Sequence, residues 1–563
     1  MIYHCEDHTC NYWDEGEKLP ERCPQCGRKL LRANEADMTG DDWTALGNTL
    51  WDAEASDKKR MVDCFRKAAY LGSAWGVCNL GICMEQGNGV EADPVQAFWL
   101  YQQAVEMGSL NAVCCLGVCY QYGIGTAPDA KQAAELYRKA AEYGSPRGQM
   151  LLAHAFHDGI GVEADAAEAV HWVRAAAYQR YGEGMYRLGV CYAYGDGVEQ
   201  NWEHAVHWFR EAAESGVSAA MTDLGWCYEK GCGVEQSWEQ AFSWYRRGAE
   251  CGNPVSMSNL GLCYKRGYGV EQNWQEAIKW YEQGAQCGDL QSMHNLACCY
   301  ERGEGVERDE DRALYWYRRG AEAGSDYCMY CLGWNYSNGE GVEQNMTEAI
   351  RWYTAAAEGG NADAMHDLGW LYDHGEGVEQ DMKKAICWYE RAAEQNRPAA
   401  MNSLGECYAM GRGVPRDLET AMEWYRRAAE LGEAMADYNM GWHLEQAGKL
   451  SEAYAHYRKA ADGNDDSAWW ALGRFYENGV VVAQDGKEAR RCYETGEKLG
   501  SVKCKMRLAR CKLLGIGGRR AKKAGLDLCR QALELAKESS EKEDYGYEAE
   551  MNLLRRTIAE NES

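Results

Sequence analysis

Four cysteines near the beginning of this 563-residue chain have the spacing of a metal site. Cys5 and Cys10 form a C-x4-C pair, and Cys23 and Cys26 form a C-x2-C knuckle. Thiolates are preferred ligands of zinc, and two such pairs can place four sulfurs tetrahedrally around one ion. A segment of about 35 residues has too small a core to fold alone, so metal binding would supply its folding free energy. We therefore predict a structural zinc ion at these four cysteines.

Three alternatives to the zinc site stay open. Iron bound by the same cysteines would serve electron transfer, although nothing else in the sequence resembles the binding site of a redox partner. His4 or His8 would replace one of the thiolates as a ligand. In the third alternative the four thiols bind no metal.

A cluster of cations near the other end of the chain is a second candidate binding site. Residues 501–526 contain nine Lys or Arg and no Asp or Glu, although the whole chain has a formal net charge of −27. We interpret this stretch as a solvated face balanced by the acidic segment 534–550; the alternative is a docking patch for an acidic peptide or RNA. The cations are Lys503, Lys505, Arg507, Arg510, Lys512, Arg519, Arg520, Lys522 and Lys523.

Two other patterns do not indicate chemistry. The recurring Gly-x-Gly turns lack the strand before and the Lys-Ser/Thr after that a phosphate-binding loop needs. His204 and His207 have the spacing of a shared metal site, but His171 lies one repeat before His207, which favours an exposed helix face. No nucleophile, base and orienting group recur with a catalytic spacing, so we predict that the protein is not an enzyme.

Charge and composition exclude several classes of partner. A net charge of −27 would repel the phosphates of nucleic acid and of anionic membranes. No run approaches the roughly 18 apolar residues of a membrane span, and the first residues lack the basic and apolar segments of a signal peptide. Seven of the 26 cysteines share one repeat position, where Cys191 and Cys407 have no second cysteine in their repeats. Such thiols fit small buried residues in a reducing compartment, so we predict a cytoplasmic protein.

A 36-residue internal repeat determines which elements carry these residues. Leucine followed by Gly or Ala recurs at this interval, alanine recurs at a second position, and tryptophan holds a third in eight successive repeats. The pattern continues less regularly at Met440, Leu472 and Leu508, and Leu46 precedes it. The regular leucines are Leu80, Leu116, Leu152, Leu188, Leu224, Leu260, Leu296, Leu332, Leu368 and Leu404.

One repeat, residues 217–252, shows what each position does. Ala220, Leu224 and Tyr228 are four residues apart and form one stripe of an α-helix. Gly225 beside this stripe would let a neighbouring backbone approach closely. Such a helix pair cannot bury its own apolar face, so neighbouring repeats must stack on each other.

The residues between the two helices predict where each helix begins and ends. Gly231 is expected to end the first helix in the left-handed conformation, and Ser237 to cap the second helix. The equivalent cap positions all carry short polar side chains that can accept from orphan backbone N–H groups. They are Asp93, Asp129, Asp165, Asn201, Ser237, Asn273, Asp309, Asn345, Asp381 and Asp417.

The repeat resembles the Sel1-like repeat, a relative of the tetratricopeptide repeat. The resemblance lies in the pattern Ala-x3-Leu-Gly-x2-Tyr-x2-Gly-x-Gly-Val, followed by Asp or Asn and then by Ala-x2-Trp-Tyr-x2-Ala-Ala-Glu. Residues 74–432 match it closely in ten copies, and residues 433–530 match it in degraded form. The resemblance implies a right-handed α/α solenoid that acts as an adaptor or scaffold and not as an enzyme. Some secreted bacterial members of the family have a disulfide in each repeat, which the unpaired cysteine positions here do not allow.

The segment around the four cysteines resembles rubredoxin-like zinc ribbons, except that its first pair is C-x4-C where that family has C-x2-C. We therefore predict an all-α solenoid with a small N-terminal zinc ribbon. The predicted domains are the ribbon (1–38), a capping helix pair (39–73), ten regular repeats (74–432), degenerate repeats with the basic patch (433–530) and C-terminal capping helices (531–563).

The favoured function is a protein–protein interaction scaffold that binds extended or basic peptide segments in a concave groove lined by the first helices. The alternative is a redox or nucleic-acid-associated accessory protein that uses the four cysteines and the basic patch. In the groove, Asn and Asp before the leucine would bond a peptide backbone and favour Lys or Arg in it, and Trp after the glycine would anchor its side chains. The alternative role of these tryptophans is to fill gaps between first helices. The predicted contact residues are Asn79, Asp223, Trp226, Asn259, Asn295, Trp334, Asp367, Trp370, Asn439 and Trp442.

Overall fold

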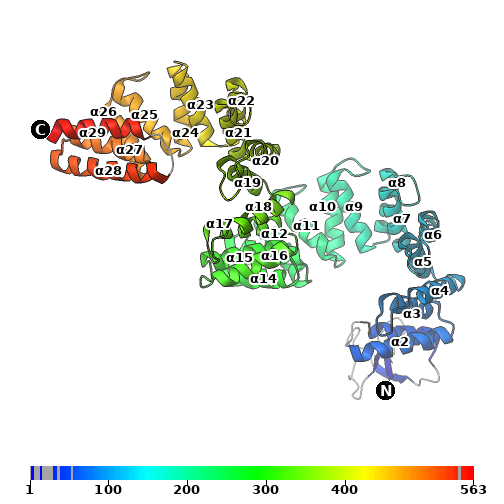
Figure 1. The fold of residues 1–563 in the computed structure, drawn as a ribbon. Coiled ribbons are helices and arrows are strands. Elements are labelled where there is room, and N and C mark those ends of the chain that lie inside the picture. The colour runs from blue at the N-terminus through cyan, green and yellow to red at the C-terminus, as the bar shows by residue number, and fades with distance from the viewer. Residues whose placement is uncertain are drawn as a thin grey trace. The chain divides into compact units, whose positions relative to one another are not determined.

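The computed structural model describes residues 2–5, 13–15, 30–33, 38–51, 55–542 and 547–562. From residue 40 onward, the described part consists of helices that alternate along the chain as fourteen antiparallel pairs and one further helix (Figure 1). Contacts divide the chain into two compact parts, Met1–Ser292 and Met293–Ser563. The repeat architecture is the same in both parts, and helix pairs that follow each other within one part pack together.

The described N-terminal residues form a small antiparallel sheet. Its strands are β1 (Ile2–Cys5), β2 (Trp13–Glu15) and β3 (Leu30–Ala33), with β1 in the middle. The all-α prediction therefore holds for the helical part of the chain, and the N-terminal segment adds a sheet. The backbone of Cys5 lies at the end of β1, and the metal site stays a prediction. The other predicted ligands lie outside the described residues, as does the alternative ligand His8: they are Cys10, Cys23 and Cys26.

The first helices of the pairs are 10 to 13 residues long and carry the leucine stripe. They are α1 (Gly40–Thr49), α3 (Ala74–Gln86), α5 (Leu110–Tyr122), α7 (Pro146–Asp158), α9 (Gly182–Tyr194), α11 (Ser218–Lys230), α13 (Pro254–Arg266), α15 (Leu290–Arg302), α17 (Asp326–Asn338), α19 (Ala362–His374), α21 (Pro398–Met410), α23 (Ala434–Gln446), α25 (Asp466–Asn478) and α27 (Val502–Leu514).

The second helices carry the alanine and tryptophan positions. They are α2 (Ala55–Tyr70), α4 (Pro94–Glu106), α6 (Ala130–Glu142), α8 (Ala166–Tyr178), α10 (Trp202–Glu214), α12 (Trp238–Glu250), α14 (Trp274–Gln286), α16 (Glu310–Glu322), α18 (Met346–Glu358), α20 (Met382–Glu394), α22 (Leu418–Glu430), α24 (Leu450–Asp462), α26 (Gly486–Lys498) and α28 (Lys522–Lys542). Helix α29 (Glu548–Glu562) follows the last pair and packs on α27 and α28. Helix α28 runs across the boundary predicted at residue 530.

The predicted caps are confirmed. Each of the ten predicted N-cap side chains accepts a hydrogen bond from a backbone N–H in the first turn of its second helix, as Ser237 Oγ does from Gln240 N at 3.3 Å. Gly231 ends helix α11 with a φ of 73°, a left-handed conformation that a Cβ would strain. Local sequence therefore defines both ends of the turn between the paired helices.

The contact that joins the two helices of a pair is an aromatic ring against a glycine. A Cβ added to Gly225 would lie 2.7 Å from Cδ1 of Tyr245, whose side chain is 1% exposed. The glycine thus makes room for a ring, and not for a neighbouring backbone as the sequence suggested. The same glycine–tyrosine contact recurs at Gly81, Gly117, Gly261, Gly333, Gly369, Gly405, Gly441 and Gly473.

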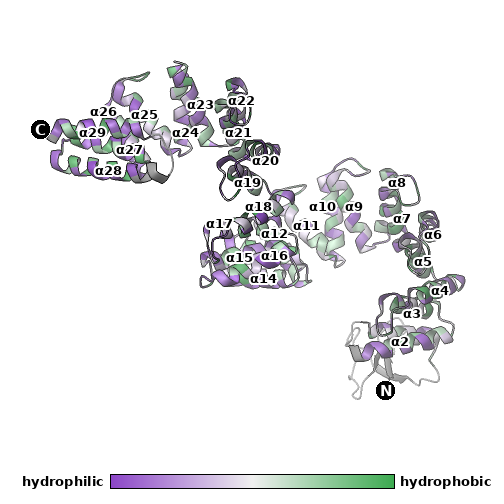
Figure 2. Ribbon diagram, viewed as in Figure 1, coloured by the Kyte–Doolittle hydropathy of each residue, from purple (hydrophilic) through white to green (hydrophobic). Residues whose placement is uncertain are grey.

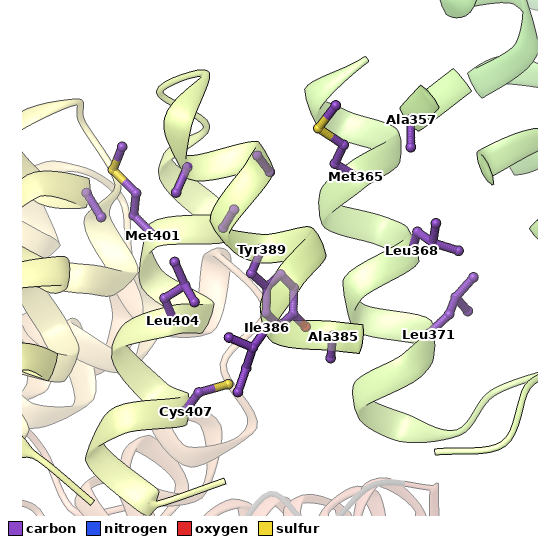
Figure 3. Close-up of a cluster of buried hydrophobic side chains, with 14 of the residues drawn as sticks. Ala357, Met365, Leu368, Leu371, Ala385, Ile386, Tyr389, Met401, Leu404 and Cys407 are labelled. Carbon is purple, nitrogen blue, oxygen red and sulfur yellow. The ribbon is translucent and has the colours of Figure 1, made fainter. Parts of the chain in front are cut away.

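The buried core consists of several clusters, and in each of them side chains of neighbouring helices pack together. Tyr389 and Ile386 of α20 lie between the first helices α19 and α21, against Leu368 on one side and Leu404 on the other (Figure 3). Hydrophilic and hydrophobic residues alternate along each helix, as expected for helices that bury one face (Figure 2). The apolar side chains of every repeat are thus completed by those of its neighbour.

The pairing of glycine with a ring predicts a reciprocal mutational effect. Replacing Gly225 with Ala should lower the free energy of unfolding by about 1–3 kcal/mol, because the added methyl overpacks Tyr245. The chain itself contains a compatible alternative, Ala153 opposite Val173, both buried. In the double variant Gly225→Ala, Tyr245→Val, the loss of unfolding free energy should therefore be smaller than the sum of the losses in the two single variants. The expected difference is about 0.5–3 kcal/mol, as measured by urea unfolding. Simple additivity of the two effects would contradict this account of the contact.

Candidate functional site

The first helices lie on the inner side of the stack in each part of the chain. In the N-terminal part α1 contacts α3, α3 contacts α5, α5 contacts α7 and α11 contacts α13; in the C-terminal part α25 contacts α27. Successive second helices do not approach each other as closely in the described residues. The inner face is therefore built from the exposed sides of first helices, as the sequence predicts for the groove.

The residues before the repeat leucines form hydrogen bonds between neighbouring first helices. Tyr330 donates from its hydroxyl to Asp367 Oδ2 at 3.0 Å, and Tyr186 makes the equivalent bond to Asp223. Burial raises the pKa of Asp223, while this hydrogen bond lowers it. The polar residues on the inner face thus take part in stacking the repeats.

The same positions correct part of the groove prediction, which assumed that these side chains have no packing role. Asn79 is only 7% exposed and donates to Asn48 Oδ1 at 2.8 Å. Asn439 donates to Asn402 Oδ1 at 3.0 Å. Asn259 and Asn295 are half-buried on α13 and α15. In Asn79 and Asn439, contacts with the neighbouring repeat therefore use part of the hydrogen-bonding capacity that the groove prediction reserved for a peptide.

The four predicted tryptophans keep a large exposed surface on the first helices. Trp226, Trp334, Trp370 and Trp442 are 39, 38, 39 and 37% exposed, in agreement with the expectation of partial exposure. Each lies three residues after the polar position, so it shares that face of its helix. One side of the indole is supported: Trp370 stacks on His374 with ring centroids 4.3 Å apart. Their role in binding stays a prediction.

A cavity of about 270 Å³ opens beside the equivalent position in an earlier repeat, where His154 stands in place of the tryptophan. It lies among α7, α8 and α9, because Val173 of α8 replaces the ring that the other regular second helices place there. The sequence prediction missed this site; its signal was the loss of the aromatic residue from that repeat position. The lining residues are Met150, Ala153, His154, His157, Asp158, Ala169, Val170, Val173, Arg187, Val190, Cys191 and Asp196.

Two histidines at this cavity are in opposite electrostatic environments. His157 lies between two carboxylates, with Nδ1 2.6 Å from Asp158 Oδ1 and Nε2 3.3 Å from Asp196 Oδ2. The hydrogen bond to Asp158, with the charge of Asp196, raises the pKa of His157. Burial, aided by the charge of Arg187, lowers the pKa of His154. Near pH 6.5 the imidazole of His157 is therefore protonated to a greater extent than that of His154.

The cysteines of the repeat position are buried, in agreement with their interpretation as small apolar residues. Burial raises the pKa of Cys227 to about 12 and that of Cys191 to about 11, so neither thiol is ionised at neutral pH. Among the described residues, no cluster of three or more potential metal ligands occurs. His204 and His207 are both exposed on α10, as predicted.

Part of the predicted basic patch is a buried ionic network. Arg507 binds Glu550 of α29 through two hydrogen bonds of 2.6 and 2.7 Å, and it also donates to Glu477 of α25 at 3.3 Å. The side chains of Arg507 and Glu550 are only 13 and 7% exposed. Arg510 pairs with Glu477 as well. Arg507 thus ties α27 to α29 and α25, Arg510 ties α27 to α25, and residues such as Arg519 and Lys522 remain on the surface.

These features define an α/α solenoid of short helical repeats with a polar and aromatic inner face. The Sel1 repeat model matches twelve segments, so the chain belongs to the Sel1 repeat family. Solenoids of this family are typical of protein–protein interaction scaffolds and are generally not enzymes. None of the described helices has the length and apolar character to cross a membrane. The matched segments are 76–109, 112–145, 146–181, 182–217, 218–253, 254–289, 290–325, 326–361, 362–396, 398–433, 434–465 and 468–501.

The solved structures that are similar to the chain include two Sel1-type repeat proteins. One is a protective antigen present in uropathogenic Escherichia coli strains that displays an SLR fold; it is 29% identical, with a TM-score of 0.52, over 76% of this chain and 94% of the other. The second is a Sel1 repeat protein from Oxalobacter formigenes, 31% identical with a TM-score of 0.40, over 43% of this chain and 96% of the other. No curated protein matches the chain.

The two histidines of the α7–α9 cavity should titrate on opposite sides of the ordinary histidine pKa of about 6.5. An NMR pH titration of the imidazole protons should give a pKa above this value for His157 and below it for His154. Replacing Asp158 with Asn should lower the pKa of His157, because it removes the carboxylate that most stabilises the protonated ring. An unchanged pKa of His157 in that variant would contradict the assignment.

Proposed function

We propose that this protein is an adaptor that binds extended peptide segments of partner proteins on the inner face of the solenoid. The observation that carries the proposal is the set of half-exposed tryptophans at one repeat position, Trp226, Trp334, Trp370 and Trp442. Large aromatic side chains in partly desolvated settings dominate the energetics of protein interfaces. Four of them on helices fixed by stacking form anchors that lose little conformational entropy on binding.

The electrostatics of the inner face support a partner segment that contains Lys or Arg. Asp223 and Asp367 each accept one hydrogen bond from a tyrosine of the preceding first helix, and both are half-buried. Asp367 Oδ1 also lies 3.0 Å from His366 Nδ1. A carboxylate has about four acceptor positions, so each of the two still retains capacity for a cation. The net charge of −27 would also speed the encounter with a basic segment.

We also propose a structural zinc ion at Cys5, Cys10, Cys23 and Cys26. The cysteine spacing supports this proposal, and the three-stranded sheet that includes Cys5 gives the segment a backbone framework. The zinc would stabilise the end of the solenoid without taking part in peptide binding. Buried thiols along the helices support a reducing, cytoplasmic location.

Removing the tryptophans should weaken partner binding while the fold persists. Replacing Trp334 or Trp370 with Ala should cost about 2 kcal/mol of binding free energy each, measured by calorimetry with a partner obtained by pull-down with the full chain. Trp99 on the second helix α4 offers a matched control, since it is 65% exposed and lies on the other side of the stack. Equal losses from Trp99→Ala, or melting of the solenoid without a binding defect, would contradict the proposed face.

Metal analysis of the purified chain should find about one zinc ion per molecule, with zinc–sulfur distances of about 2.3 Å by X-ray absorption. The variant Cys23→Ser, Cys26→Ser should lose the metal. Its helical circular dichroism should stay nearly unchanged, because each repeat depends mainly on its neighbours. A chain folded in excess zinc that binds none would refute the site, and bound iron would favour the redox alternative.

A further inference from the structure

In the regular repeats, a tryptophan fills the outer space between successive second helices. This position holds Trp in eight successive repeats, from Trp172 to Trp424. An arginine one turn later covers the indole: Arg427 Cζ lies 4.4 Å from the ring centroid of Trp424, and Arg391 Cζ lies 4.3 Å from that of Trp388. In four of the eight repeats with this tryptophan, the outer face is therefore closed by an aromatic ring under an arginine.

The walls of this space are also defined by repeated contacts. Trp208 lies against Tyr178, at the end of the preceding second helix, with ring centroids 5.7 Å apart. Two further aromatic residues complete the space one repeat later, where Phe242 meets Tyr264 edge-on at 5.4 Å beside Trp280. The tryptophan of each second helix is thus surrounded by the start and the end of the preceding second helix and by the end of the first helix of its own pair.

The repeat formed by α23 and α24 departs from this pattern at the tryptophan and tyrosine positions and keeps a cation at the arginine position. His456 stands at the tryptophan position, Leu444 at the tyrosine position and Lys459 at the arginine position. The loop between the helices is also four residues shorter than in regular repeats, because α23 ends at Gln446 and α24 begins at Leu450.

The shorter loop has a visible consequence for the preceding second helix. In the regular repeat before it, the loop packs on the start of α20, where a Cβ added to Gly413 would lie 2.7 Å from Met382 Cβ. The equivalent start of α22 has no such loop over it, and Leu418 is 39% exposed, whereas Met382 is half-buried.

These changes leave a cavity of about 610 Å³ among α22, α23 and α24, within the size range of ligand sites. Its apolar floor consists of Met422, Met440 and Leu444, which are equivalent to the residues that surround the indole in regular repeats. The remaining lining residues are Arg426, Ala429, Glu430, Asp437, Lys449, Glu452, His456 and Lys459.

Three charged side chains at the rim have no ion-pair partner among the described residues: two are cations, and the third is the carboxylate of Glu430. His456 Nδ1 lies 2.7 Å from Asp437 Oδ1, and Lys449 pairs with Glu452 at 3.9 Å. Arg426 and Lys459 have no ion-pair partner among the residues that the structure describes, and both are exposed at the mouth. An aromatic ring in the cavity would lie beside these cations, as the indoles of four regular repeats lie under their arginines.

We infer that this cavity binds an aromatic side chain of a partner protein, a tryptophan or tyrosine flanked by acidic residues. The ring would take the place that the chain's own tryptophan has in eight other repeats, and the flanking carboxylates would pair with Arg426 and Lys459. The site lies between second helices, so it is distinct from the inner face of the proposed function and its test is independent of that face.

The experiment uses the full chain and short blocked peptides observed by fluorine NMR, with a fluorinated tryptophan as the probe because the protein contains 22 Trp. Acetyl-Glu-Trp-Glu amide should bind, and its alanine analogue should not. The variant Leu444→Tyr, His456→Trp restores the regular residues and should weaken binding by at least about tenfold while raising the melting temperature. Ala455→Trp, which adds the same indole at a neighbouring exposed position, should bind as the unmodified chain does.

Charge provides a second, independent variant. Replacing Arg426 and Lys459 with Glu should reverse the preference, so that the Lys-flanked tryptophan peptide binds more tightly than the Glu-flanked one. Both residues are exposed, so the fold should persist. The inference would be overturned if the peptide bound the Leu444→Tyr, His456→Trp variant as tightly as the unmodified chain, or if it did not bind the unmodified chain. It would also be overturned if free indole bound as tightly as the peptide, because the ligand would then be a small aromatic compound.

Discussion

The burial of an aromatic ring against a helical glycine is the contact on which the solenoid depends. Tyr245 lies on Gly225 so closely that a single methyl group would not fit, and its hydroxyl donates to Glu229 Oε2 at 2.8 Å. The contact fixes the angle and distance of the two helices in a pair, and hence the apolar surface offered to the next pair. Because each repeat needs that surface covered, stability is approximately a sum of neighbour terms along the chain.

In a solenoid in which one contact is repeated, the repeats that lack this contact differ most from the others. Val173 removes a ring on the inner side, and His456 with Leu444 removes two on the outer side. Each loss opens a cavity lined by the residues that would otherwise surround the ring, together with polar groups that the regular repeats do not bring together. Binding sites can therefore arise in a solenoid through local loss of packing, while neighbouring repeats keep the backbone in place.

Polar residues on the inner face have two roles that compete. The Tyr330–Asp367 hydrogen bond and the Asn439–Asn402 hydrogen bond join adjacent first helices and limit how far a partner can use these groups. The four tryptophans at the neighbouring position form no such hydrogen bond between described first helices, and each stays more than a third exposed. The division suggests that polar residues align the repeats and aromatic residues bind the partner. Arg507 shows the limiting case, in which a cation is fully engaged by two carboxylates, Glu550 of α29 and Glu477 of α25.

The sequence by itself determined the helix pairs, their caps and the order of repeats, because these depend on contacts within 36 residues that recur many times. Ser237, Gly231 and Leu224 could each be assigned a role from spacing alone. Only the tertiary structure decided what Gly225 accommodates, that Asn79 is buried against Asn48, and that Arg507 is an internal ion pair. Those outcomes depend on side chains that are distant in sequence or on departures from the repeat. A periodic pattern predicts the average neighbour of a residue, whereas a cavity or an ion pair depends on the particular neighbour that folding brings to it.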